Sequence, residues 1–450
     1  MIALIMFVAV CAILLAGFPV ALTLGGVALW FALGGVAQGA LRPVDLLDFS
    51  SRLFGTLSNE TLIAVPLFIL MGVVLERARL AEDLLHGLQQ LWGRSRGGLG
   101  YTVILVGALL AASTGIVGAT VVTLGLLCMP VMLRQNCPPS LAAGTIAAAG
   151  TLGQIIPPSI VLVLLGDVLS SAYQQAQLRL GVFSTQTVSV GDLFAGALLP
   201  GLLLVAVYLL YFAWRSRTLP AVPTTEQSAH WGQLLQVLVA PLLLILTVLG
   251  SILGGVATPT EAASLGALGA LLLAAARGRL AVRMLFETAL TTMQMTAMVF
   301  LILIGASLFS LVFNAYEGDV FVQELLGSLP GGLSTALVAV MLLVFLLGFV
   351  LDFIEITFVV VPIVGPALLM LGADPVWLGV LLALNLQTSF LTPPFGFALF
   401  YLRGVTPAEV PTQAIWAGAW PFVLIQLLVL TLVAFWAPLA TWLPTLIYGL

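Results

Sequence analysis

The groups best placed to do chemistry in this sequence are main-chain carbonyls next to two proline pairs. Pro157-Pro158 and Pro393-Pro394 each interrupt an apolar segment. Proline has no backbone donor and cannot continue a regular helix, so carbonyl oxygens lose their partners there. Lipid cannot replace those partners, and the oxygens must be satisfied by protein, water or an ion. Both breaks are therefore predicted to line a cavity within the membrane.

Two acids form the second candidate group. Asp352 and Glu355 lie in an apolar segment, where each charge costs about 3 kcal/mol on insertion scales, so a role is expected. We interpret Asp352 as an ion-binding or structural-network residue, whereas Glu355 also fits a buried or interfacial carboxylate. Their spacing places them on one helical face, which leaves a membrane enzyme with an acid–base or aspartyl pair as an alternative. The matching stretch in the first half, residues 112–120, has no acid, and this argues against an enzyme.

Composition restricts the class of protein. The chain has 450 residues, of which 61% are hydrophobic and only 7% are charged, too few charges to cover a soluble protein of this length. A multi-pass membrane protein is predicted, with the lipid bilayer as its surroundings and no nucleic acid partner. Three cysteines fit neither a disulfide framework nor a metal site. Residues 1–35 lack a basic region and a cleavage site, so we expect retained membrane structure rather than a signal peptide.

The spacing of the prolines indicates an internal repeat. The two proline pairs are 236 residues apart, and the same offset relates Pro130 to Pro366 and Pro139 to Pro375. We therefore divide the chain into a first repeat, 1–214, a polar linker, 215–233, and a second repeat, 234–450. An odd number of crossings between the proline pairs would make the repeats inverted.

Each repeat is predicted to contain three special elements. The segments 43–77 and 283–315 are expected to be re-entrant hairpins, because polar runs at 56–61 and 291–296 split them into arms too short to cross. Broken helices are expected at 98–133 and 335–370, and helices with a proline pair at 139–166 and 376–403. The predicted fold is an all-α membrane protein with two inverted repeats, about ten transmembrane helices and two re-entrant hairpins.

Four motifs together resemble one transporter family. Val65–Gly72, Ala143–Ser159, Thr258–Ala262 and Asn385–Gly396 are similar, in this order, to the large membrane subunit of tripartite ATP-independent periplasmic (TRAP) transporters. The resemblance covers nearly the whole chain. The run Asp352–Ile356 resembles the branch often labelled mannitol/chloroaromatic.

The resemblance implies a function and partners. It implies a sodium-coupled importer of organic acids in the bacterial inner membrane, not an enzyme, working by elevator-type alternating access with sodium as coupling ion and no other cofactor. The implied partners are a small four-helix membrane subunit and a periplasmic solute-binding protein. A stand-alone ion-coupled carrier of the same architecture, without a binding protein, remains the alternative.

The resemblance and the breaks together suggest where ions and solute bind. The expected ligands of a first sodium site are Ser58, Asn59, Ser113, Thr114, Gly115, Gly118 and Pro157. Those of a second sodium site are Thr292, Gly348, Asp352, Thr357, Thr392 and Pro393. A carboxylate solute is expected between the polar tips, in contact with Asn59, Glu355 and Gln387. Half-helix N-termini would favour its negative charge.

Overall fold

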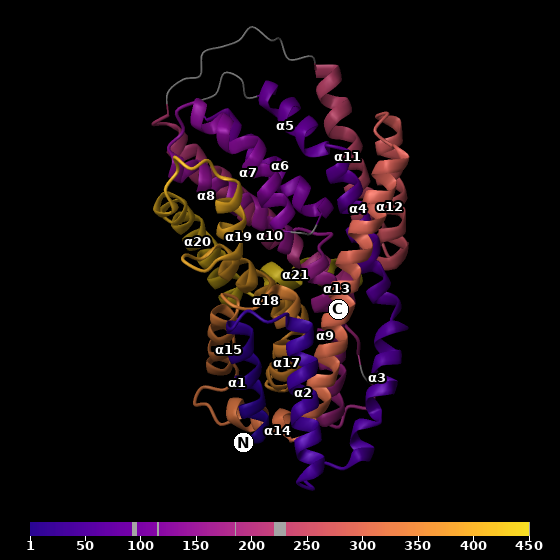
Figure 1. The fold of residues 1–450 in the computed structure, drawn as a ribbon. Coiled ribbons are helices and arrows are strands. Elements are labelled where there is room, and N and C mark those ends of the chain that lie inside the picture. The colour runs from indigo at the N-terminus through magenta and orange to yellow at the C-terminus, as the bar shows by residue number, and fades with distance from the viewer. Residues whose placement is uncertain (92–96, 115–116, 185, 220–230, 450) are drawn as a thin grey trace.

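The computed structural model describes residues 1–91, 97–114, 117–184, 186–219 and 231–449, and within these ranges the regular structure is helical throughout. Figure 1 shows the helices as an elongated bundle. Part of the predicted linker, residues 220–230, lies outside the described residues.

The helices fall into two runs along the chain. The first run comprises α1 (Ile2–Leu15), α2 (Val20–Ala37), η1 (Pro43–Leu46), α3 (Asp48–Leu57), α4 (Glu60–Arg77), α5 (Leu80–Leu91), α6 (Gly98–Thr114), α7 (Val117–Arg134), α8 (Pro139–Thr151), η2 (Leu152–Gln154), α9 (Ile160–Arg179) and α10 (Val190–Ser216). The second comprises α11 (Trp231–Leu253), α12 (Pro259–Ala276), α13 (Val282–Ala315), α14 (Gly318–Gly327), α15 (Leu333–Leu347), α16 (Phe353–Glu355), η3 (Ile356–Val360), α17 (Val361–Met370), α18 (Pro375–Leu391), α19 (Phe397–Val405), α20 (Thr412–Phe435) and α21 (Pro438–Tyr448).

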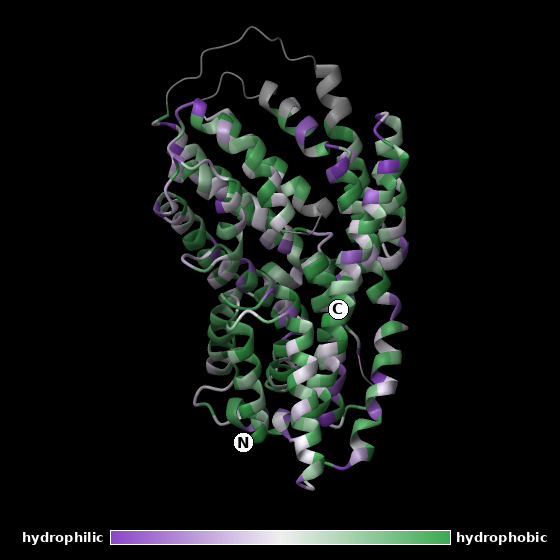
Figure 2. Ribbon diagram, in the orientation of Figure 1, coloured by the Kyte–Doolittle hydropathy of each residue, from purple (hydrophilic) through white to green (hydrophobic). Residues whose placement is uncertain are grey.

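Hydrophobic residues predominate along most of these helices (Figure 2). Seven of the described helices are long and apolar enough to cross a membrane, or eight if the bent pair α3–α4 counts as one span. This confirms the all-helical, multi-span prediction. The count is lower than the ten crossings expected, because breaks leave five further apolar helices with only 10–17 residues each.

The two proline pairs interrupt helices in equivalent ways. A break separates η2 from α9 at the first pair and α18 from α19 at the second. Hydroxyl groups supply donors at both places: Ser159 Oγ donates to the carbonyls of Gly153 (2.9 Å) and Gln154 (3.1 Å). At the second break, Thr392 Oγ1 donates to the carbonyl of Thr388 at 2.7 Å. Part of the hydrogen bonding lost to proline is thus replaced by neighbouring side chains.

The hairpin predicted at 283–315 is wrong, because α13 is one continuous helix of 34 residues. The polar run 291–296 contains neither glycine nor proline, and a helix can accommodate it. Thr291 Oγ1, for example, donates to the carbonyl of Glu287 at 2.9 Å, within its own helix. A run of threonines in an apolar segment therefore did not mark a turn.

The hairpin predicted at 43–77 is also wrong. The axes of α3 and α4 differ by 47°, so the chain bends there without turning back. Asn59 starts the new helix as its N-cap, accepting a hydrogen bond from the amide of Thr61 at 2.9 Å. Side-chain capping needs only one or two non-helical residues, and this explains why a polar run makes a bend here.

Helical hairpins do occur, at the two segments predicted as broken helices. In the first, α6 and α7 pack side by side, and Gly100 near the start of α6 lines the same small cavity as Met132 near the end of α7. Both ends therefore lie on one side. In the second, α15 packs against α17, and Val340 of α15 lines the same cavity as Ile363 of α17, on either side of the turn at 348–352. Two hairpins were predicted and two are present, but each lies later in the chain than predicted, in the segment expected to be a broken helix.

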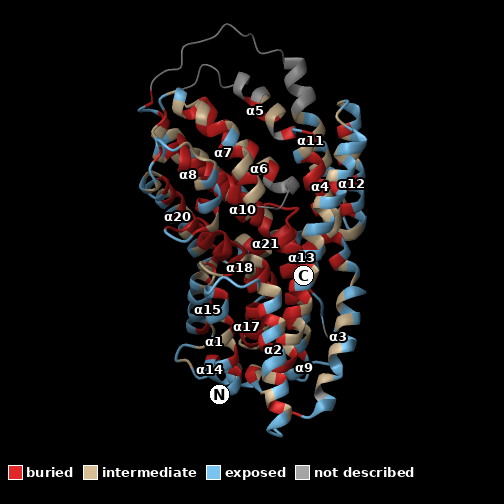
Figure 3. Ribbon diagram, in the orientation of Figure 1, coloured by how far each residue is buried: buried red, intermediate tan, exposed pale blue. Residues whose placement is uncertain are grey.

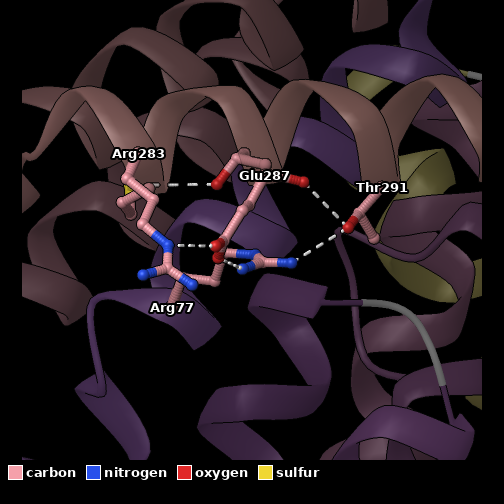
Figure 4. Close-up of polar contacts among 6 residues, drawn as sticks. Arg77, Arg283, Glu287 and Thr291 are labelled. Carbon is pink, nitrogen blue, oxygen red and sulfur yellow. Dashed lines mark hydrogen bonds and ion pairs between the residues drawn. The ribbon is translucent and has the colours of Figure 1, made fainter.

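Equivalent segments of the two repeats run antiparallel, as inverted repeats require. At one end Arg77, the last residue of α4, forms an ion pair with Glu287 near the start of α13 (2.6 Å; Figure 4). Glu287 also pairs with Arg283 at 2.9 Å. At the other end, Leu62 of α4 and Leu303 of α13 line one cavity. The two helices therefore point in opposite directions.

The helices form two packed groups. The pairs α4–α12, α2–α13 and α11–α12 make one, which includes the ion pairs of Figure 4. The hairpins, the proline-pair helices, α10 and α20 make the other. Buried residues concentrate in this second group, around α8, α10, α17 and α18 (Figure 3), whereas α3 has no buried residue.

The tightest helix crossing joins α8 to α20. A Cβ atom added at Gly418 would lie 1.9 Å from the carbonyl oxygen of Ser140, and one added at Gly144 would lie 1.9 Å from that of Gly418. Both obstacles are backbone atoms, which cannot move aside. Two glycines in register thus set the distance between one helix of each repeat.

We predict that Gly418→Ala lowers the thermal unfolding midpoint of the detergent-solubilised protein, because overpacking of this kind costs about 1–3 kcal/mol. Gly26→Ala in α2 is the matched control, since nothing lies within 4 Å of its added Cβ atom. This control should leave the midpoint unchanged or raise it slightly, because alanine favours helices. Equal midpoints for the two variants would contradict the crossing.

We predict that Ser159→Ala destabilises the protein by about 1–3 kcal/mol, because two carbonyls at the first break lose a buried donor. Thr431→Ala removes an equivalent hydroxyl-to-carbonyl bond at an exposed helical position, Thr431 to Leu427 (2.7 Å), and should cost less than about 0.5 kcal/mol. Thermal unfolding monitored by circular dichroism measures both. A Ser159→Ala variant as stable as Thr431→Ala would show that the break needs no hydroxyl donor.

Candidate functional site

The two helical hairpins meet at one cavity of about 400 Å³, which we call the tip cavity. Gly118, just after the first turn, and Asp352, at the end of the second, both line it. Helices α4, α9, α13, α18 and α19 complete the wall, so both repeats contribute. The remaining lining residues are mostly apolar or aromatic: Ile69, Val117, Ala119, Val122, Ile160, Met295, Met298, Val299, Phe353, Ile354, Phe390 and Tyr401.

Asp352 owes its position to helix capping. Its Oδ1 accepts a hydrogen bond from the amide of Phe353 at 2.7 Å, and its own amide donates to Glu355 Oε2 at 3.1 Å. The reciprocal bonds form a capping box, which fixes the first turn of α16 and the angle of the carboxylate. Glu355 is buried, with 6% of its surface exposed, and does not line the tip cavity. The hydrogen bond from the Asp352 amide therefore accounts for the buried Glu355 carboxylate, and no contact with solute is needed.

The described wall of the tip cavity carries negative charge only. Among the described residues that line it, Asp352 is the one charged side chain. A carboxylate in an apolar wall attracts cations and repels anions, and both effects are stronger at low dielectric constant. The cavity is therefore suited to a cation by itself, and to an anion only after a cation has entered.

Glycines let both turns approach the proline-pair helices closely. A Cβ atom added at Gly348 would lie 2.2 Å from Ser389 Oγ in α18. One added at Gly118 would lie 3.0 Å from the ring of Tyr401 in α19, at the tight limit of contact. Each hairpin thus lies against the broken helix of the second repeat.

Three of the predicted ligand residues lie in the breaks themselves. Pro157, Thr392 and Pro393 do not appear among the described residues of the tip cavity wall. Thr357 is fully buried in η3, and its hydroxyl has no hydrogen-bond partner among the described residues. None of these four residues therefore lines the tip cavity among the described residues.

Three other predicted ligands do not line the tip cavity. Asn59 lies ten residues from Ile69 along α4, roughly 15 Å at the helical rise, and lines a different cavity. Ser58 is the exposed C-cap of α3. Thr292 lies inside α13, where its hydroxyl is buried without a described partner.

Three more of the predicted sodium ligands are Ser113, Thr114 and Gly115. Gly115 lies outside the described residues, and the side chains of Ser113 and Thr114, at the end of α6, are outside them too. The predictions for these three residues are therefore not tested.

Gln387 belongs to a buried network between the repeats. Its Nε2 donates to Thr151 Oγ1 at 3.4 Å, and the two residues hold equivalent positions, 236 apart. Gln426 Nε2 approaches the same hydroxyl at 3.4 Å and donates to the Tyr208 hydroxyl at 2.8 Å. All four residues are fully buried. Gln387 lines neither cavity, and this location argues against the predicted contact with solute.

Sequence reasoning missed several residues of these cavities. Tyr401 and Phe390 carried no signal beyond aromatic side chains near a proline pair. Asp167 carried a clear one, since it is an acid within the apolar helix α9, the same signal that singled out Asp352. It lies beside Asn59, whose Nδ2 donates to its Oδ1 at 2.7 Å.

Comparison with known proteins identifies the family. Residues 7–439 match the model of the tripartite ATP-independent periplasmic transporter, DctM component. The chain is 30% identical over 461 residues to the C4-dicarboxylate TRAP transporter large permease protein DctM of Rhodobacter capsulatus, covering 99% of both chains. It is 28% identical to the isethionate TRAP transporter permease protein DctMQ of Oleidesulfovibrio alaskensis, covering 88% of this chain and 59% of that protein.

A solved structure supports the fold. The YdaH transporter of Alcanivorax borkumensis superposes with a TM-score of 0.62 at 16% identity, over 87% of this chain and 89% of that one. The sequence match over nearly the whole length is what assigns the family, and that family consists of transporter permeases, not enzymes. This chain belongs to the large permease (DctM) component of the TRAP transporters, a family of multi-pass proteins of the bacterial inner membrane.

Proposed function

We propose that this permease takes up an organic acid together with sodium ions, and that both bind around the tip cavity. The observation that carries the proposal is the convergence of two helical hairpins, one from each repeat, on a cavity whose one described charge is Asp352. Sodium prefers oxygen ligands, which turns and helix breaks supply as main-chain carbonyls.

The ion ligands we propose are those near the turns and breaks. The first set is Ser113, Thr114, Gly115, Gly118 and Pro157. The second set is Thr292, Gly348, Asp352, Thr357, Thr392 and Pro393. Support for the second set comes from the Asp352 carboxylate and from the unpartnered Thr357 hydroxyl. Ser58 and Asn59 are left out, because Asn59 lines the other cavity. Thr292 stays a proposed ligand of the second set, because it lies one helical turn from Met295 of the tip cavity and its hydroxyl has no described partner.

Cation binding would prepare the cavity for an anion. Bound sodium would offset the Asp352 charge and lower the cost of placing a carboxylate in an apolar wall. Solute without sodium would meet only repulsion, so the two would bind together. This charge relation is a physical basis for symport.

Transport would proceed by movement of one helix group past the other. The group with the hairpins and broken helices holds the tip cavity, while α4 and α13 of the other group form its opposite wall. Alternating access of this kind moves a rigid body around or with a fixed site. Under the proposal, the ion pairs of Figure 4 hold the static group together.

The proposed partners are a small membrane subunit and a periplasmic solute-binding protein that delivers the acid. The relative named DctMQ supports the first, because it is longer than this chain and its name joins two components. Relatives named for a C4-dicarboxylate and for isethionate are similarly identical to this chain, so they do not favour the mannitol/chloroaromatic branch, which remains a prediction.

We predict that proteoliposomes containing the permease, its small subunit and the matching binding protein accumulate the acid only under an inward sodium gradient. Omitting sodium, or the binding protein, should reduce uptake to the level of empty vesicles. Radiolabelled solute retained on filters measures the uptake. Sodium-dependent uptake without the binding protein would favour the stand-alone carrier instead, and uptake without sodium would exclude the coupling.

We predict that Asp352→Asn raises the half-saturating sodium concentration at least about tenfold, since a charged ligand contributes about 1.5–3 kcal/mol. Asparagine also caps helices well, so α16 should keep its start and the protein its stability. Asp374→Asn is the matched control, because Asp374 caps α18 outside the tip cavity, accepting from the amide of Trp377 at 2.8 Å. Sodium dependence that is the same in both variants would remove Asp352 from the ion site.

A further inference from the structure

A second cavity, of about 320 Å³, lies beside the tip cavity and differs from it in chemistry. We call it the Arg52 cavity. Its volume is at the lower end of the range for small-molecule sites, about 300–1,000 Å³. One cation, Arg52, and one carboxylate, Asp167, line it among the described residues. Six neutral hydroxyl or amide side chains accompany them: Thr56, Asn59, Ser171, Gln175, Ser307 and Ser310.

Arg52 has no partner for its charge. No ion pair or hydrogen bond joins its guanidinium group to the residues that the structure describes, and Asp167 is bonded to Asn59 instead. A guanidinium group presents five donors in a fork that matches a carboxylate. Free donors of this kind, facing a cavity wide enough for a small molecule, fit an anion.

The two cavities lie one after the other along shared helices. Along α9 the wall passes from Ile160 in the tip cavity to Asp167 in the Arg52 cavity, two turns further on. Along α13 it passes from Val299 to Leu303, one turn further on. The antiparallel α4 runs the other way, from Ile69 to Leu62, again two turns. Along all three helices the Arg52 cavity therefore lies in the same direction from the tip cavity, at a distance of roughly 6–10 Å.

We propose that the Arg52 cavity is a second solute site, which binds a hydroxylated monocarboxylate on its way to or from the tip cavity. Arg52 binds the carboxylate, and the hydroxyl and amide side chains bind the solute hydroxyls. Asp167 accepts from one hydroxyl and repels a second carboxylate, so a dicarboxylate binds less well. The inference rests on the proposed transport of organic acids, but it requires no sodium, because the positive charge is supplied by Arg52.

The test is equilibrium binding of radiolabelled gluconate to the purified permease–small subunit complex in sodium-free choline buffer. Gluconate carries one carboxylate and several hydroxyls. Wild type should bind it saturably, and Arg52→Gln should weaken binding at least about tenfold. The matched control is Arg134→Gln, at an exposed arginine that ends α7 and lines neither cavity, and it should bind as wild type does.

A second variant separates binding from folding. Ser171→Leu fills the cavity from an exposed position on α9 and should also weaken gluconate binding, with an unchanged thermal midpoint. Succinate should compete less well than gluconate. No saturable binding to wild type, or equal binding by wild type and both cavity variants, would overturn the proposal. Because sodium is absent throughout, these results do not depend on whether uptake proves to be sodium-coupled.

Discussion

Unpaired main-chain oxygens inside a membrane are the constraint on which this fold depends. Two proline pairs create them at equivalent positions, and lipid cannot satisfy them. Both breaks lie in the more deeply buried of the two helix groups (Figure 3). Residues 155–159 at the first break are all buried, whereas Pro394 and Phe395 at the second are exposed. Ser159 and Thr392 supply some of the missing donors. What remains unpaired must find a partner within the protein, and the end of α15 packs there, with Gly348 held directly against Ser389.

Inversion of the repeats explains how one cavity comes to be built from both halves. Because α4 and α13 run antiparallel, the hairpins that follow them enter from opposite ends and their turns meet in the middle. The same inversion brings Thr151 and Gln387, equivalent residues of the two repeats, into contact. This buried contact joins the two helices that lead into the breaks.

The sequence predicted the repeat and the breaks because proline acts through local backbone chemistry that no tertiary contact can reverse. The hairpins were misplaced because polar runs have no single meaning in an apolar segment. Thr291 stays helical, since its hydroxyl bonds to a carbonyl of its own helix. The turn at 348–352 had the better signal, a glycine followed by an acid that caps the next helix. Capping chemistry was thus more informative than polarity.

Of the two charged residues that mark the cavities, the sequence predicted Asp352 but not Arg52. Asp352 stood out because a charge in an apolar segment needs an explanation, whereas Arg52 lies in a polar stretch where an arginine needs none. Only the fold reveals that Arg52 lacks a partner and faces a cavity next to that of Asp352. The two cavities carry opposite charges along one column of helices. Under the two proposals, an acid held by Arg52 would gain nothing by moving toward Asp352 until a cation had arrived there, so the order of charges would oppose the entry of solute without a coupling ion.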